Sequence, residues 1–318
     1  MRRILITGVA WFVWFNLAKR FLQEWEYVFG IDNLISGQMT NIEYLEEFDN
    51  FKYQLADIRN SLNWLDNDFD EIYNLACPAS PIFYQDMPLL TIETNTIGMQ
   101  NILDFSQWKS LVLQASTSEV YGDPLVHPQY ENYKGNVNTV WPRACYDEWK
   151  RIAETLMYEY NKRYNNCRII RIFNTYWPWM RADDGRVISN FIRQALHNKD
   201  LTIYGDWEQT RSFQYIDDLL NGMIAMMRNK EEFMWPVNIG TQYEFTMKEL
   251  ADLVLKLIPE CKSKIVFKEL PQDDPYKRKA DNKLAKKLLW WEPKVTLEEW
   301  LKKTIEYFRN VTYKSFIS

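Results

Sequence analysis

Two short stretches of the sequence carry the residue types needed for proton transfer at an alcohol. Thr117 follows an apolar run at residues 111–115, and Tyr146 and Lys150 stand four residues apart at the start of a helical pattern. Residues with this spacing share one helix face, and an ammonium near a phenol lowers the phenol's pKa from its usual value of about 10. A threonine hydroxyl can hydrogen-bond the same substrate oxygen. The trio therefore suits removal of a proton from an alcohol while a hydride leaves the same carbon.

The spacing of Tyr146 and Lys150 is by itself a weak signal, because solvated helix faces often carry a tyrosine and a lysine in this arrangement. The context strengthens it. The pair follows a predicted buried strand and the turn Thr117-Ser118-Glu119, where an α/β protein presents reactive side chains. We therefore interpret Tyr146 and Lys150 as a catalytic pair.

The elements that must position these residues alternate between strands and helices. Buried strands are predicted at residues 3–7, 27–31, 53–56, 71–76, 111–115 and 168–173, and helices to about residue 24 and over about 89–105. This alternation predicts an α/β fold with a doubly wound, mostly parallel sheet of the Rossmann type. Ligands of such sheets lie beyond the carboxyl ends of the strands. The residues at those ends are Asp32, Asp57, Ala76, Thr117 and Asn174.

The first of these units has the layout of a dinucleotide site. A strand at residues 3–7 is followed by a turn at Gly8, a helix, and a second strand that ends in Asp32. An acid in this place bonds the ribose hydroxyls of adenosine, which favours NAD over NADP. A solvated acid at a strand end is the alternative for Asp32 taken alone.

The pattern changes after about residue 175, where loops lengthen and short strands mix with helices. We therefore divide the chain into residues 1–175, an NAD-binding unit, and residues 176–318, a smaller C-terminal α/β lobe for the substrate. Some elements of the second part can cross back to the sheet. A polar loop at residues 272–279 is, by its charges alone, typical of a solvated linker.

Composition excludes several classes of protein. The chain has 318 residues and a net charge of −5 with both signs mixed, so it carries no basic footprint for nucleic acid. No apolar run has the length of a membrane span, and the N-terminal apolar run is too short for a signal peptide. The four scattered cysteines indicate reduced thiols in the cytoplasm, and two histidines leave little material for a Ser-His-Asp triad or a metal site.

Several longer motifs occur in a fixed order along the chain. They lie at residues 117–124, 127–129, 142–148, 171–175, 184–191, 209–215 and 273–279. Together they resemble the extended short-chain dehydrogenase/reductase family, and within it the UDP-glucuronate decarboxylases. The resemblance runs from about residue 1 to residue 309.

The resemblance implies decarboxylation of UDP-glucuronate to UDP-xylose on a bound NAD, through a 4-keto sugar, in a homodimer. Tyr146 would take the proton of the sugar 4-hydroxyl, Lys150 would hold the nicotinamide ribose, and Thr117 would bond the C4 oxygen. Glu119 and Arg278 would lie near the sugar during loss of carbon dioxide. The cofactor contacts that it implies are Gly8, Trp11, Phe12, Val13, Asp32, Asn33, Asp57, Ile58, Leu75 and Ala76, besides Tyr146 and Lys150. The substrate contacts are Ser118, Asn174, Arg186, Arg211 and Tyr215.

The residue at position 118 separates related reactions. Sugar 4,6-dehydratases carry Asp-Glu after the threonine, because expulsion of a hydroxyl needs a general acid, whereas this chain has Ser118-Glu119. A guanidinium such as Arg278 suits a carboxylated substrate. A nucleotide-sugar 4-epimerase or 4,6-dehydratase is the alternative function within the family.

The glycine motif of the family is altered in this chain. Gly8 is kept, but Val9, Trp11 and Trp14 stand where the family has glycines that let the backbone approach the pyrophosphate. An indole has roughly 200 Å² of surface, so we expect it to displace phosphate or helix. The chain has 10 glycines against 14 tryptophans, and other tryptophans expected to be glycine are Trp25, Trp141, Trp149, Trp177, Trp207, Trp290 and Trp300, with Trp179 in place of an arginine. An inactive variant with a blocked NAD site is therefore a further alternative.

Overall fold

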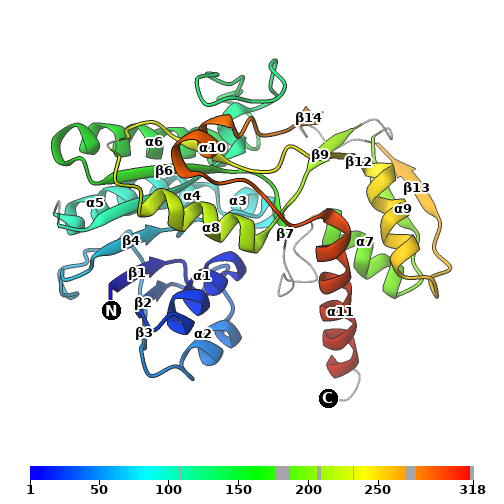
Figure 1. The fold of residues 1–318 in the computed structure, drawn as a ribbon, viewed down its shortest axis with the longest axis horizontal. Helices are drawn as coiled ribbons and strands as arrows, with labels where there is room; N and C mark the ends of the chain where they lie inside the picture. The colour runs from blue at the N-terminus through cyan, green and yellow to red at the C-terminus, as the bar shows by residue number, and fades with distance from the viewer. Residues whose placement is uncertain (108, 177–186, 206–208, 232, 270–276, 316–318) are drawn as a thin grey trace.

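A parallel seven-stranded sheet forms the centre of the protein (Figure 1). The computed structural model describes residues 1–107, 109–176, 187–205, 209–231, 233–269 and 277–315, with side chains to residue 310. In spatial order the strands are β11 (Val237–Ile239), β6 (Cys167–Ile172), β5 (Leu111–Thr117), β4 (Glu71–Asn74), β1 (Arg3–Thr7), β2 (Tyr27–Asp32) and β3 (Phe51–Leu55). Every neighbouring pair is parallel, which confirms the predicted fold class.

Helices cover both faces of this sheet, as the nearly continuous apolar character of the strands requires. In β1, Ile4 and Ile6 face α1 (Phe12–Gln23), while Leu5 belongs to the cluster on the opposite face. The first face also carries α2 (Met39–Leu45) and α8 (Ile216–Met227). The second carries α4 (Pro88–Glu93), α5 (Met99–Ser106) and α6 (Ala144–Tyr164). Figure 1 shows the two layers on either side of the strands.

The helix predicted at 89–105 is a composite of α4, one π-helical turn (Thr94–Gly98) and α5. The side chains of Thr94, Asn95 and Thr96 each bond the carbonyl oxygen four residues earlier, at 2.7 to 2.9 Å. Such bonds compete with the backbone ladder and loosen it locally. The widened turn places Gly98 against Ile58, where a Cβ would approach the isoleucine side chain to 2.8 Å.

A smaller group of elements extends to one side of the sheet and includes α7 (Val187–Leu196), α9 (Met247–Leu257) and α11 (Leu297–Ser315) (Figure 1). Its strands form three small sheets. They are β8 (Leu201–Tyr204) with β13 (Ile265–Lys268), β7 (Thr175–Tyr176) with β10 (Gln214–Tyr215), and β9 (Thr210–Ser212) between β12 (Glu244–Thr246) and β14 (Lys277–Arg278). Thr246 and Glu249 form a capping box that fixes the start of α9.

Three elements from beyond residue 175 lie on the large sheet. β11 pairs with β6 at its edge, α8 packs against the first face, and α10 (Lys283–Leu289) contacts β11 and α8. The chain thus returns twice to the sheet after entering the smaller group.

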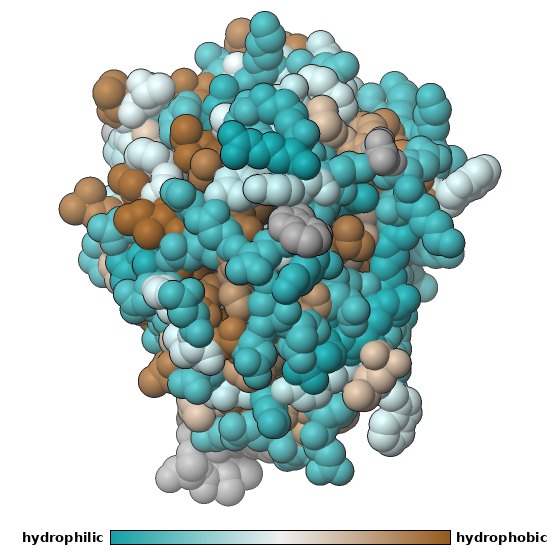
Figure 2. Space-filling model, turned by 90° about the vertical axis from the view of Figure 1, so that its left-hand side faces the viewer, coloured by the Kyte–Doolittle hydropathy of each residue, from teal (hydrophilic) through white to brown (hydrophobic). Residues whose placement is uncertain are grey.

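One face of the molecule is largely polar. Figure 2 shows a face on which hydrophilic side chains predominate and hydrophobic ones gather in patches among them. None of the described helices is both long enough and apolar enough to cross a membrane.

Candidate active site

The turn after β5 presents the first of the predicted catalytic residues. β5 lies between β4 and β6, and its last residue, Thr117, is extended at φ −144°. The chain then enters a 3-10 turn (Ser118–Tyr121), in which the Thr117 hydroxyl accepts a hydrogen bond from the Glu119 amide at 3.3 Å. Gly122 ends the turn at φ +62°, and a Cβ there would lie 2.0 Å from the Asn136 carbonyl oxygen. Only glycine fits that place, so it fixes the direction in which the turn leaves the strand.

The first turns of α6 hold Tyr146 and Lys150 beside this strand. Both side chains are buried, and the Lys150 ammonium donates to the Ala115 carbonyl of β5 at 2.9 Å. The Lys150 Nζ lies 5.9 Å from the centre of the Tyr146 ring. That ring stacks on Tyr84, with 4.9 Å between centroids and 12° between planes. Strand and helix thus lock the pair that the four-residue spacing predicted.

The direction of the Tyr146 pKa differs from the sequence expectation. Burial of the ring raises the pKa well above its usual value, and the negative potentials of Cys77 and Glu119 add to that effect. A hydrogen bond with Thr117 opposes it. The sequence predicted lowering by Lys150, but the ammonium of that residue bonds a strand carbonyl. Desolvation of the phenol is therefore the main cause of the raised pKa.

Glu119 joins two arginines that come from different parts of the chain. One carboxylate oxygen pairs with Arg143, just before α6, and the other with Arg278 of β14. Burial opposes ionisation of Glu119, but Arg143 and Arg278 outweigh it and hold the carboxyl pKa below its usual value. Arg278 also donates to the Gly122 carbonyl at 2.8 Å. The loop expected to be a plain linker on its charges alone therefore ends in a buried arginine at the catalytic turn.

A cavity of about 330 Å³ lies beside this ion cluster. It is lined by Glu119, Arg143, Arg278 and Asp147. Asp147 is buried, and its Oδ1 atom has no hydrogen-bond partner among the described residues. Burial, reinforced by the charge of Glu119, raises the pKa of Asp147 to about 7. This carboxyl group therefore changes charge near neutral pH.

A cavity of about 680 Å³ collects most of the predicted catalytic and substrate residues. It lies over the carboxyl ends of β5 and β6, between the sheet and the smaller group of elements. The predicted residues that line it are Thr117, Ser118, Glu119, Tyr146, Lys150, Asn174, Arg211 and Arg278. Tyr215 is buried at the start of α8 and does not line it, and Arg186 is outside the described residues.

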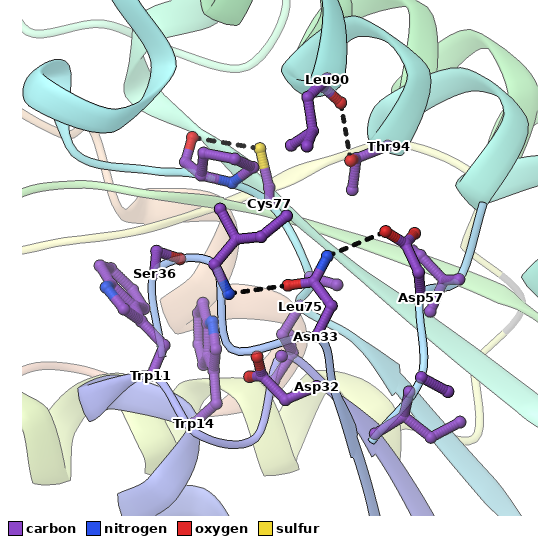
Figure 3. A pocket seen from close by; sticks show the side chains of 17 residues that line it. Trp11, Trp14, Asp32, Asn33, Ser36, Asp57, Leu75, Cys77, Leu90 and Thr94 are labelled. Atoms are coloured by element: carbon purple, nitrogen blue, oxygen red, sulfur yellow. Dashed lines mark hydrogen bonds between the residues drawn. The ribbon is translucent and has the colours of Figure 1, made fainter. Parts of the chain in front are cut away.

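A much smaller cavity, of about 40 Å³, collects the predicted cofactor residues (Figure 3). Those that line it are Gly8, Trp11, Asp32, Asn33, Asp57, Ile58, Leu75 and Ala76; Val13 lines the large cavity and Phe12 neither. The backbone of the first turn keeps a tight form. Gly8 has φ +75°, its amide donates to the Ile31 carbonyl at 2.7 Å, and a Cβ on it would lie 3.0 Å from Ala76.

The indoles of Trp11 and Trp14 lie side by side in this cavity, as Figure 3 shows. Their rings are 5.6 Å apart between centroids, and both line the small and the large cavity. Trp11 is the N-terminal cap of α1, and the helix starts at Phe12. Of the two expected outcomes, displacement of phosphate or of the helix, the structure agrees with the first, because α1 keeps its start and the rings point toward the cavity at the end of the sheet.

The acidic residues around the small cavity are engaged with the protein itself. The Asp32 carboxylate accepts the Ala10 and Leu34 amides at 2.9 and 2.8 Å, and burial raises its pKa. Asp57 accepts hydrogen bonds from Asn33, at 3.0 Å, and from Arg59. These contacts hold the two carboxylates at the ends of β2 and β3, where the sequence placed them.

The two cavities differ in how well they fit the predicted dinucleotide. The large one has room for a nicotinamide and a sugar beside Tyr146 and Lys150. The small one, at about 40 Å³, has space for little more than a water molecule. The residues present therefore fit NAD at its reactive end and do not fit its pyrophosphate at the first turn.

Sequence reasoning missed three residues of the site. Arg143 holds Glu119, Tyr84 stacks on Tyr146, and Cys77 lines both cavities. Arg143 belongs to the motif at 142–148, so its place next to Tyr146 was a usable signal. Tyr84, in α3 (Pro81–Asp86), and Cys77 stand in no pattern that marks them.

Comparison with known proteins gives concordant matches. The family described as GDP-mannose 4,6 dehydratase matches residues 5–304. UDP-glucuronic acid decarboxylase 1 of Xenopus tropicalis is 47% identical over 311 residues, which cover 97% of this chain and 72% of that protein. UDP-glucuronic acid decarboxylase 6 of Arabidopsis thaliana is 47% identical over 96% of this chain and 89% of its own.

Solved structures resemble the fold over almost the whole chain. The UDP-glucuronic acid 4-epimerase of Bacillus cereus, in complex with UDP-glucuronic acid and NAD, has a TM-score of 0.86 and 28% identity, and covers 97% of this chain and 99% of its own. The UDP-glucose 4-epimerase of Thermotoga maritima, with UDP-glucose, has a TM-score of 0.88 and 26% identity over 98% and 99% of the two chains.

Proposed function

Because this chain belongs to the extended short-chain dehydrogenase/reductase family, we propose that it decarboxylates UDP-glucuronate to UDP-xylose. Relatives named UDP-glucuronic acid decarboxylase are 45–47% identical over nearly all of its length. Within the molecule, one observation carries the proposal. The Tyr146–Lys150 pair and the Arg278 guanidinium face one cavity, so a group that handles an alcohol proton lies with a group that holds a carboxylate.

Tyr146 and Thr117 handle the proton at the sugar 4-hydroxyl. The Thr117 hydroxyl bonds the C4 oxygen, and the Tyr146 phenol oxygen exchanges the proton with it. Burial raises the pKa of the Tyr146 phenol, and positive charge close to the phenol oxygen favours loss of its proton. Lys150 and Tyr146 would hold the nicotinamide end of NAD, which when bound would accept the C4 hydride and return it.

For carbon dioxide to leave, the protein must hold the substrate carboxylate in place without stabilising its negative charge so strongly that the bond to C5 is kept. A ketone at C4 makes the sugar a β-keto acid, so the bond from C5 to the carboxylate breaks and its electron pair enters an enolate. Arg278 orients the leaving carboxylate. Glu119 pairs with both Arg278 and Arg143, so its negative charge is divided between the two guanidinium groups. A solvent proton then returns to C5. The hydride removed from C4 in the first step would return there from the cofactor, while Tyr146 gives the proton back to the C4 oxygen.

The nucleotide portion lies toward the smaller group of elements in this proposal. Asn174 and Arg211 line the cavity there, and a guanidinium can hold a diphosphate through two hydrogen bonds. Arg186 and Tyr215 would act behind them. Residues 1–175 would then carry the cofactor and residues 176–318 the UDP-sugar, apart from the elements that return to the sheet. We extend the proposal to a homodimer in the cytoplasm. Tight binding of NAD, which the family resemblance implies, would need room for its pyrophosphate at the first turn.

The test is incubation of the purified protein with NAD and UDP-glucuronate labelled at the carboxylate. Release of labelled carbon dioxide together with UDP-xylose supports the proposal. Conversion to UDP-galacturonate without carbon dioxide would instead support a 4-epimerase, the activity named for the Bacillus cereus structure. Conversion of UDP-glucose or dTDP-glucose to a 4-keto-6-deoxy sugar would support a dehydratase.

A further inference from the structure

Two tryptophans adopt a backbone conformation that favours glycine. Trp25 follows α1 at φ +62°, and Trp290 caps the end of α10 at φ +53°. The left-handed region costs an ordinary residue roughly 1–2 kcal/mol, and helices commonly end in it with a glycine. Neither indole gains burial in exchange, because Trp25 is 81% and Trp290 is 93% exposed. Both are large apolar rings in solvent at places where a hydrogen atom would suffice.

Two other tryptophans occupy space rather than an unusual backbone angle. Trp11 has φ −84°, so its backbone tolerates any residue. Its ring and that of Trp14 instead line the cavity of about 40 Å³ at the amino-terminal end of α1. The amino-terminal end of a helix after the first strand is where a dinucleotide pyrophosphate binds, and glycines there let the backbone approach it.

The surroundings of this turn still have the form of a close-approach site. A Cβ on Gly30 would lie 2.6 Å from Val9, and one on Gly37 would lie 2.6 Å from Ala10. Gly8 keeps its left-handed angle and its contact with Ala76. Three glycines thus keep the turn tight, while two indoles fill the space that a tight turn leaves open.

The overall composition agrees with these four positions. Ten glycines in 318 residues is about half the share of ~7% in average proteins, and tryptophan is more frequent than glycine. We infer that these four tryptophans occupy glycine positions of the fold, and that the form of this protein that binds NAD well carries glycine at positions 11 and 14. The inference rests on the proposed function only for the identity of the dinucleotide.

Peptide masses of the protein isolated from its own host test the inference directly. Glycine at positions 11 and 14 supports it, and tryptophan at both positions together with tight binding of NAD overturns it.

Calorimetric titration of the full-length chain with NAD tests whether the tryptophans at positions 11 and 14 weaken the binding of NAD. The double variant Trp11→Gly/Trp14→Gly should bind NAD roughly 100-fold more tightly than the parent chain, since two rings leave the space of the pyrophosphate. UDP binding should be unchanged in both proteins, which reports that the variant is folded. Trp64→Gly is the matched control, because Trp64 is 48% exposed, has no left-handed angle and lines neither cavity.

If the parent and the double variant bind NAD with equal affinity while UDP binding is intact, the inference about positions 11 and 14 is overturned. If the glycine variant binds UDP poorly, Trp11→Ala/Trp14→Ala repeats the test with less backbone freedom. The outcomes separate this inference from the proposed reaction. A variant that binds NAD tightly but releases no carbon dioxide from UDP-glucuronate supports the inference and contradicts the decarboxylase.

Thermal unfolding tests the two exposed positions. Trp25→Gly and Trp290→Gly should each raise the unfolding midpoint by roughly 2 °C, since each relieves a left-handed residue and loses little burial. Trp64→Gly should not raise it. A lower midpoint for both variants would show that the indoles support the helix ends, which overturns the assignment of those positions.

Discussion

The turn after β5 and the turn after β1 lie at the same edge of one sheet, and each is followed by chain that leads to a helix. After β5, Gly122 sits where only glycine fits, and Glu119 and Thr117 face a cavity of about 680 Å³. After β1, Gly8 is kept, but Trp11 and Trp14 occupy the space beyond it, and the cavity that remains has a volume of about 40 Å³. The reactive groups and the cofactor cradle are therefore set by different residues, and a chain can keep one while altering the other.

The fold tolerates the altered turn because of where the indoles go. Trp14 is 5% exposed and packs with the cluster on the first face, so its ring adds apolar contact. Trp11 packs against the same cluster, and the helix keeps its start at Phe12. The indoles therefore take up space at the cofactor cradle while the fold of the turn is kept. Stability and cofactor affinity thus respond to different parts of the same turn.

The largest effect expected at the β5 turn is loss of turnover in Tyr146→Phe. Removal of the phenol oxygen leaves no group to exchange the proton of the sugar hydroxyl, so kcat should fall by about 10²–10⁴-fold. Stacking on Tyr84 and binding of UDP should persist, since the ring remains. Steady-state assays with a UDP titration as control measure this, and a kcat within threefold of the parent would exclude Tyr146 as the proton-transfer residue.

The next effect concerns the buried ion cluster. Glu119→Gln removes the carboxylate that pairs with both Arg143 and Arg278, and breaking a buried ion pair costs about 3–5 kcal/mol of the free energy of unfolding. The matched control is Glu24→Gln, which breaks an exposed pair with Arg20 and should cost less than about 1 kcal/mol. Urea unfolding compares them, and equal losses would show that the cluster is solvated.

Asp147, next to the β5 turn, makes the free energy of unfolding depend on pH. Its folded pKa of about 7 lies above the unfolded value near 3.9, so the folded protein binds the extra proton. Stability should therefore fall as pH rises from about 4 through about 7, by no more than roughly 4 kcal/mol from this group. Asp147→Asn should remove that slope and be the more stable protein at pH 8. Unfolding of both proteins across this range checks it, and an unchanged slope would contradict it.

The smallest effect is expected at the β1 turn. In Gly30→Ala the new methyl group would meet Val9 at 2.6 Å, and the valine must shift. Overpacking of this kind costs about 1–3 kcal/mol. Combining it with Val9→Gly should restore most of the loss. If the single variant is as stable as the parent, the turn has more room than its contacts indicate.

Several features could be predicted from the residues in order. The apolar runs and their spacing predicted the parallel sheet, and the four-residue spacing predicted that Tyr146 and Lys150 share a helix face. Asp32 and Thr117 were placed at strand ends for the same reason. These are local properties, because the periodicity of helices and strands is carried by neighbouring residues.

Other features depend on parts of the chain far apart in sequence, and only the tertiary structure decided them. Arg278 meets Glu119 across 159 positions, and Arg143 meets it across 24. Tyr84 reaches Tyr146 because α3 packs beside α6. The direction of the Tyr146 pKa also depends on burial, which no local pattern encodes. The sequence by itself therefore determined the fold class and the reactive residue types. Packing alone decided which charges meet, how much water they lose, and how much room the tryptophans leave for a dinucleotide.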